Sequence, residues 1–168
     1  MGGEVRKLWK HQQEMVDKAT PLPGYGFMGE PGSGKTAACI HTLRNQYNKN
    51  RRLMRTLIFC PPIVIENWKN EFLLNSKIDQ SSITCLMGTG KQRLKTFLEK
   101  SEKPHIFITN YETMQMDVYE EFLKWNPEAV VFDECHRLAN YTSKRSKAAE
   151  KLVNGKMIYD KKTNSYSV

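Results

Sequence analysis

One stretch of eight residues limits the fold of this chain more than any other. Residues 29–36 read Gly-Glu-Pro-Gly-Ser-Gly-Lys-Thr and match the pattern G-x-x-x-x-G-K-[ST]. The apolar run Tyr25 to Met28, typical of a buried strand, precedes the stretch, and Lys35 to Tyr47, which has helical spacing, follows it. Glycines let backbone N–H groups converge, and a helix N-terminus attracts anions, so strand, loop and helix in this order predict a phosphate-binding site.

The residue types of the loop indicate which phosphates it takes. Lys35 is expected to reach the β- and γ-phosphates of a nucleoside triphosphate, and the hydroxyl of Thr36 to bind Mg²⁺, which prefers hard oxygen ligands. The residues expected to line this site are Gly29, Glu30, Pro31, Gly32, Ser33, Gly34, Lys35 and Thr36.

Alternation of strands and helices continues along the chain. Four more apolar runs predict buried strands: Thr56 to Cys60, Ile83 to Met87, His105 to Thr109 and Ala129 to Phe132. Helical spacing marks Lys10 to Ala19, Glu66 to Leu74, Lys91 to Lys100 and Ser143 to Val153. This order predicts an α/β fold, a doubly wound and mostly parallel sheet with helices on both faces, whose ligands bind at the carboxyl ends of the strands.

Two carboxylates follow the last of these strands. Asp133 and Glu134 come directly after Ala129 to Phe132, at the same sheet edge as the glycine loop. An Asp-Glu pair after a strand is usually a solvated turn, but with the loop upstream it has a chemical use. Asp133 is expected to hold the Mg²⁺ bound by Thr36, and Glu134 to orient the water that attacks the γ-phosphate.

These residues carry a family resemblance. Asp133-Glu134-Cys135-His136 resembles the DExH box of superfamily 2 helicases and translocases, and Leu8-Trp9-Lys10-His11-Gln12 resembles the Q-motif region of their Swi/Snf-type branch. The resemblance implies a RecA-like ATPase fold, with Gln12 reading the adenine edge of ATP and Gln13 as the alternative if the register slips. It also implies that His136 couples the ATP site to the next motif.

Two further segments resemble motifs Ia and Ib of the same branch. They are residues 60–72, with Asn67 and Trp68, and residues 108–112, with Thr109 and Asn110. The resemblance extends to Arg137-Leu138-Ala139-Asn140, which follows the acidic box. It implies sequence-independent contacts to the DNA backbone through Asn67, Thr109 and Asn110. A tryptophan at helical spacing is more typical of core packing, so Trp68 is expected to be a core residue.

The resemblance also sets the expected organisation. Residues 21–159 are expected to form the first RecA-like ATP-binding domain, residues 1–20 a Q-motif-like helix of the same domain, and residues 160–168 a polar tail or truncation point. Lys156 to Tyr159 is expected to start another strand. The family's motif III is not recognised in the sequence, and its second RecA-like domain, which supplies an arginine finger, is expected to be absent. The chain is therefore expected to be an ATP hydrolase that is weak on its own.

Two alternatives remain open. A non-catalytic module, split or truncated from a helicase, would bind nucleotide and DNA without turnover. An ATPase acting on proteins would leave motifs Ia and Ib and the basic charge unexplained.

Composition favours a polyanionic partner inside the cell. The formal charge is +8, and basic residues gather between His41 and Arg55 and between Ser143 and Lys156, although such a surface also serves solubility alone. The four cysteines form no C-x-x-C pair, which favours reduced, buried thiols over a zinc site or disulfides. No apolar run is long enough for a membrane span and no secretory signal is recognised, so we expect a cytoplasmic protein without membrane contacts.

Overall fold

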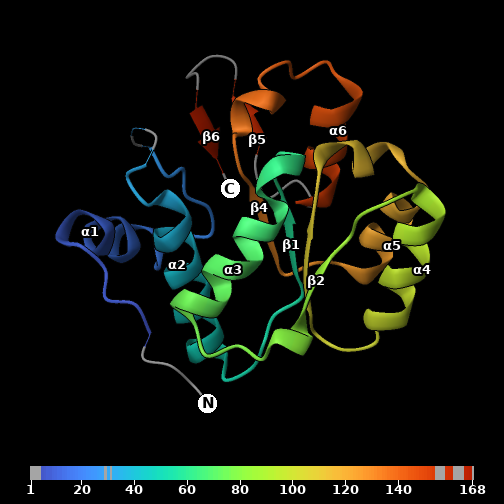
Figure 1. Cartoon of the computed structure of the whole chain (residues 1–168). Helices are drawn as coiled ribbons and strands as arrows, with labels where there is room; N and C mark the ends of the chain where they lie inside the picture. The colour runs from blue at the N-terminus through green and yellow to red at the C-terminus, as the bar shows by residue number, and fades with distance from the viewer. Residues whose placement is uncertain (1–4, 29, 31, 154–157, 161–164, 168) are drawn as a thin grey trace.

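A four-stranded parallel sheet forms the centre of the computed structural model, which describes residues 5–28, 30, 32–153, 158–160 and 165–167. Its strands are β1 (Thr56–Phe59), β2 (Ile83–Cys85), β3 (Ile106–Thr109) and β4 (Ala129–Phe132), in the order β2-β3-β1-β4 (Figure 1). Leu57 of β1 stands opposite Phe107 on one side and Val130 on the other. The predicted doubly wound α/β fold is confirmed.

Helices cover both faces of this sheet (Figure 1). On one side lie α1 (Lys10–Ala19), α2 (Lys35–Asn50) and α3 (Ile65–Asn75), with α1 packed on α2. On the other side lie α4 (Gly90–Lys100), α5 (Val118–Trp125) and α6 (Lys144–Leu152). Short 3-10 helices connect them: η1 (Pro62–Val64), η2 (Gln80–Ser82), η3 (Tyr111–Gln115) and η4 (Cys135–Leu138).

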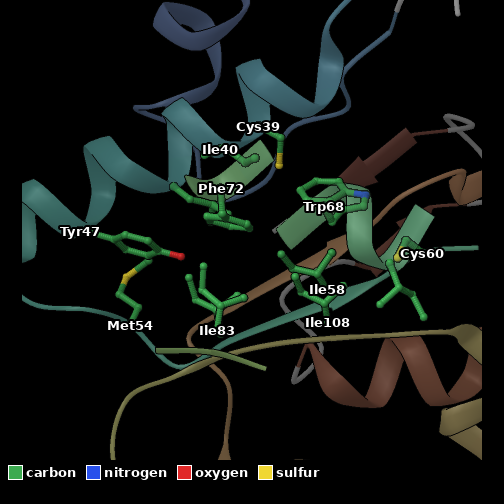
Figure 2. Packing of buried hydrophobic residues seen from close by; sticks show 13 residues of the cluster. Cys39, Ile40, Tyr47, Met54, Ile58, Cys60, Trp68, Phe72, Ile83 and Ile108 are labelled. Atoms are coloured by element: carbon green, nitrogen blue, oxygen red, sulfur yellow. The ribbon is translucent and has the colours of Figure 1, made fainter. Parts of the chain in front are cut away.

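The strand side chains divide into two cores because they alternate between faces. Ile58, Ile106 and Ile108 join α2 and α3 in the first core (Figure 2). Leu57 and Phe107 join α4, α5 and α6 in the second. Every residue of β1 and β3 is buried, as expected for central strands of a parallel sheet.

Helix α5 lies in a segment for which no helix was predicted. Val118 and Phe122 are spaced by one helical turn and are both fully buried, so the pattern was present but short. The helix ends where Asn126 adopts a left-handed conformation, with φ of 51°.

The predicted strand Tyr25 to Met28 is wrong. The segment has no regular secondary structure and pairs with no described strand, and the sheet ends at β4. Tyr25 and Met28 are exposed, while Phe27 is partly buried against the first core. Gly26 offers no side chain to pack, and a strand without a neighbour has no ladder to satisfy its backbone groups, so the apolar pattern alone does not form one.

The last described residues form a separate antiparallel pair, β5 (Ile158–Asp160) and β6 (Ser165–Ser167). The strand expected from Lys156 therefore begins at Ile158 among the described residues, and Lys156 and Met157 lie outside them. The stretch expected to be a polar tail contains β6.

Two expectations from composition concern cysteines and membranes. Cys39 and Cys60 are buried, Cys85 is partly buried, and all four cysteines are free, but Cys135 is exposed, because it belongs to the acidic turn rather than to the strand before it. Among the described residues no helix has the length and apolar character needed to span a membrane.

Candidate ATP-binding site

The glycine loop turns into α2 at Gly34. This residue is left-handed, with φ of 78°, and its carbonyl accepts the first helical bond from the Ala38 N–H at 3.1 Å. Lys35 Nζ donates to the carbonyl of Glu30 at 3.0 Å, so the lysine lies back across the loop. Of the predicted lining residues, Gly29 and Pro31 lie outside the described residues.

The N-terminal glutamine packs directly on this loop. Gln12 Nε2 donates to the Ser33 carbonyl at 3.4 Å, and His11 Nε2 lies 3.0 Å from the same oxygen. A Cβ added at Gly34 would fall 1.9 Å from Gln12 Nε2. Gln13, in contrast, is exposed and donates to Asp17. The register therefore places Gln12, and not the alternative Gln13, beside the phosphate loop.

Asp133 is held at the end of β4 by four hydrogen bonds. Its N–H donates to the Phe59 carbonyl at 2.8 Å, and its carbonyl accepts from Tyr111 Oη at 2.5 Å. Its Oδ1 accepts from the Glu134 N–H at 3.0 Å, and its Oδ2 accepts from Trp68 Nε1 at 2.8 Å. Both the backbone and the carboxylate of Asp133 are thus fixed.

Asp133 and the first turns of α2 border the same core cluster. Cys39, one turn after Lys35, is buried, and burial together with the nearby Asp133 carboxylate raises the pKa of its thiol to about 12. Trp68 belongs to the same core cluster as Cys39 (Figure 2). The acidic turn and the helix that begins at the glycine loop therefore lie on one side of the sheet, with Trp68 between them.

The oxygen groups at this edge suit Mg²⁺. The Asp133 carboxylate and the Thr36 hydroxyl, both on half-buried residues, are hard donors of the kind that Mg²⁺ prefers. The described residues hold no group of three or more His, Cys, Asp or Glu side chains that would bind a metal by itself. Mg²⁺ commonly takes one or two protein ligands and completes its shell with phosphates and water, so the set fits a magnesium-nucleotide site.

Glu134 adopts an unusual backbone conformation. Its φ of 54° is left-handed, a region that non-glycine residues favour little and that concentrates at functional sites. Its carboxylate Oε2 lies 3.2 Å from His136 Nδ1, and both side chains are exposed. The pair places the predicted water-orienting group and the predicted coupling residue in direct contact.

The three candidates for DNA contact differ in exposure. Asn67 is exposed on α3. Thr109 and Asn110 are buried, and Arg93 Nη1 donates to Asn110 Oδ1 at 2.7 Å while Thr109 Oγ1 donates to the Leu86 carbonyl at 3.1 Å. Their side chains thus hold the end of β3 and the buried guanidinium of Arg93.

The structure adds residues that sequence reasoning did not assign to the site. Trp68 is a core residue, as predicted, and is 2% exposed, but its indole N–H also binds Asp133. Tyr111 and Arg93 are buried beside the same strand ends. Trp68 and Tyr111 lie inside the segments that resemble motifs Ia and Ib, and this was the one sequence signal for their role. Arg93 had no such signal.

The two basic segments lie at different places. Arg52 pairs with Glu128, and the Arg55 N–H donates to the same carboxylate at 3.0 Å, at the end of the sheet where β1 and β4 begin. Arg145 of α6 lies with its guanidinium 5.8 Å from the centre of the Tyr111 ring, near the carboxyl ends. Arg145 therefore lies nearer to the candidate site than Arg52 and Arg55 do.

A phosphate loop that leads into α2 and an acidic turn that follows β4, with α2 packed on the same parallel sheet, define a P-loop nucleotide-binding domain. The family model for the SNF2-related domain matches residues 19–159, so the chain belongs to that family. It is an SNF2-type domain of the superfamily 2 helicases and translocases, an ATPase-type family, as the sequence resemblance implied.

Similar proteins agree with this assignment. The chain is 29% identical over 157 residues to an uncharacterized ATP-dependent helicase of Mycoplasma genitalium, covering 89% of this chain and 14% of that protein. It is 32% identical over 117 residues to the chromodomain-helicase-DNA-binding protein 1-like of Danio rerio, covering 68% of this chain and 11% of that protein. The chain thus spans a small part of the length of these relatives.

A solved structure shares the fold. It is the SWI2/SNF2 ATPase core of Sulfolobus solfataricus in complex with dsDNA, with a TM-score of 0.68 and 20% sequence identity. The match covers 89% of this chain and 30% of that chain. The likeness supports the RecA-like α/β architecture.

Proposed function

We propose that this chain is the first RecA-like motor domain of an ATP-dependent DNA helicase or translocase and that it binds Mg-ATP at residues 29–36. The observation that carries the proposal is that left-handed Gly34 begins α2 while Asp133 ends β4, and that Trp68, which binds Asp133, packs in one core cluster with Cys39 of α2. P-loop enzymes combine a phosphate cradle and a carboxylate in this way. Membership of the SNF2-related domain family supports it.

The loop provides the contacts to the nucleotide. Backbone N–H groups and the N-terminus of α2 bind the phosphates, and Lys35 exchanges the Glu30 carbonyl for the β- and γ-phosphates. Gln12, which already lies on the loop, reads the adenine edge.

The acidic turn provides the groups for hydrolysis. Thr36 and Asp133 hold Mg²⁺, which supplies positive charge against the phosphate oxygens when bound. Glu134 orients the attacking water, and His136, which contacts Glu134 in the structure, couples this group to neighbouring motifs.

DNA binds across the carboxyl ends of the strands. Support comes from the net charge of +8 and from the structurally similar SWI2/SNF2 ATPase core of Sulfolobus solfataricus, which was solved in complex with dsDNA. Asn67 contacts the phosphate backbone through its exposed side chain, whereas the buried Thr109 and Asn110 contribute through the backbone of their loop. Such contacts position DNA without reading its sequence.

Full turnover requires a second RecA-like domain, in the same protein or in trans. An arginine finger from a partner is worth about 10³ to 10⁵ in rate in related phosphoryl-transfer enzymes. The domain alone therefore binds ATP and hydrolyses it slowly, and it works wherever in the cell DNA is accessible.

The test is nucleotide binding and hydrolysis by a protein that contains both domains. Lys35→Ala is expected to abolish ATP binding, since the charge that meets the phosphates is lost. Glu134→Gln is expected to bind ATP with near-normal affinity but to lose DNA-stimulated hydrolysis by about 10² or more. Full ATPase activity in either variant would overturn the assigned roles. Normal binding without any turnover in the wild-type protein, with DNA and the second domain present, would favour the non-catalytic module instead.

A further inference from the structure

The indole of Trp68 donates its only hydrogen bond to a carboxylate of the candidate ATP site. Trp68 lies on α3, is 2% exposed, and its Nε1 is 2.8 Å from Asp133 Oδ2. In Figure 2 its ring lies in the core cluster between Cys39 of α2 and Ile58 of β1, and its ring centre is 6.3 Å from that of Phe72. Packing on these sides fixes the direction in which the N–H points.

A buried indole needs an acceptor, but it does not need this one. Trp125 has an equivalent indole bond, and its Nε1 donates to the backbone carbonyl of Ser101 at 2.8 Å. A bond to an ionised carboxylate is shorter and roughly twice as strong as a neutral bond. The acceptor of Trp68 therefore restricts the rotamer of Asp133 in a way that core packing alone does not require.

The remaining bonds of Asp133 leave room for a metal. Oδ1 accepts from the Glu134 N–H, and Oδ2 accepts from Trp68. An ionised carboxylate offers about four lone-pair positions, so about two stay available for Mg²⁺ or for water bound to it.

The helix that carries Trp68 also carries Asn67, which is exposed on its outer surface. We propose that Trp68 is a positioning residue, which orients the Asp133 carboxylate for Mg²⁺ and thereby joins α3 to the metal site. This inference rests on the proposed Mg-ATP site. One turn of α3 then has the proposed DNA contact on its exposed side and the Asp133 contact on its buried side.

The direct test compares Trp68→Phe with Trp125→Phe in the full chain. Each variant removes one indole hydrogen bond and keeps an aromatic ring, so Trp125→Phe controls for the loss of such a bond at a partly buried position. Binding of a fluorescent, non-hydrolysable ATP analogue is measured against Mg²⁺ concentration and in EDTA. Trp68→Phe is expected to raise the Mg²⁺ concentration for half-maximal effect by about 10- to 100-fold, as loss of outer-shell partners does at metal sites. Binding in EDTA is expected to stay unchanged, and Trp125→Phe to behave as wild type.

The outcomes separate this inference from the proposed function. A wild-type chain that binds the analogue equally with Mg²⁺ and EDTA would overturn the assigned Mg²⁺ role of Asp133, and the role of Trp68 with it. A Mg²⁺-dependent wild type with an unchanged Trp68→Phe curve would overturn only the role of Trp68. Loss of binding in EDTA would also overturn it, because the defect would then lie in the nucleotide loop.

A spectroscopic measurement covers the case in which Trp68→Phe does not fold. The chain has three tryptophans, so Trp9→Phe and Trp125→Phe assign the Trp68 indole N–H resonance by elimination. We expect this resonance to shift in Asp133→Asn, and in wild type on adding Mg²⁺ with the ATP analogue but not on adding the analogue in EDTA. A resonance that is unmoved in both cases would overturn the inference.

Discussion

Replacing Gly34 by alanine tests the geometry of the phosphate loop in two ways. The first cost is the backbone, since φ of 78° is left-handed and an L-residue there costs about 1–2 kcal/mol. The second is Gln12, because the new Cβ would fall 1.9 Å from its Nε2, so the amide must swing away. It then loses its bond to the Ser33 carbonyl and the bond that its Oε1 accepts from the Trp9 N–H, together worth about 1 kcal/mol.

The total for Gly34→Ala is therefore about 2–3 kcal/mol, which lowers Tm by about 4–12 °C in a chain of this size. Urea unfolding of wild type, Gly34→Ala, Gln12→Ala and the double variant separates the two costs. In the Gln12→Ala background only the backbone cost of about 1–2 kcal/mol should remain. Equal costs of Gly34→Ala in both backgrounds would refute the close approach of Gln12, and a cost near zero would refute the left-handed turn itself.

Two further predictions concern pH. Burial, and then the charge of Lys100, lowers the pKa of His105 from 6.5 to about 4, so only the unfolded chain takes up this proton between those values. Stability should thus fall as the pH drops from 6.5 toward 4, by at most about 1.4 kcal/mol per pH unit from this group, and His105→Gln should flatten that part of a urea-unfolding profile. A slope unchanged in the variant would show that other groups cause it. The Arg52 hydrogen bond is the main cause that lowers the pKa of Glu128 from 4.5 to about 2, so its stabilisation is present above pH 4.5 and is lost as the pH falls through about 2. Glu128→Gln should cost about 1 kcal/mol at pH 7, discounted for solvent screening, and the difference from wild type should shrink in acid; a constant difference would contradict the ion pair as its source.

The sequence predicted well those elements whose pattern is continuous and local. β1 and β4 are uninterrupted apolar runs, and their predicted bounds agree with the structure to within a residue. The start of α2 follows from the loop, because the glycine before Lys35 supplies the turn that begins the helix. Tyr25 to Met28 shows the limit, since an apolar run forms a strand only where a neighbour supplies the ladder, and periodicity does not reveal that neighbour.

In the candidate site, too, local motifs could be predicted from the sequence, whereas contacts between distant residues could not. The loop and the acidic pair could be identified from their sequence motifs, because their chemistry depends on residue types at fixed spacing. The contacts between them could not, since the Trp68–Asp133 bond joins residues 65 positions apart and the Arg93–Asn110 bond joins residues 17 apart. Such pairs meet only because β3, β1 and β4 end at one edge. A sequence pattern predicts which groups a site needs, whereas the fold decides which neighbours orient them.

That distinction changes how the segments resembling motifs Ia and Ib are understood. Trp68 donates to the carboxylate of Asp133 and Tyr111 donates to its carbonyl, so each segment contacts the acidic turn through one buried aromatic residue. A displacement of either segment must therefore break a hydrogen bond to Asp133 or carry this residue with it. If DNA binds where we propose, its position and the orientation of the candidate metal ligand are linked by two short contacts, without any need for a longer path through the core.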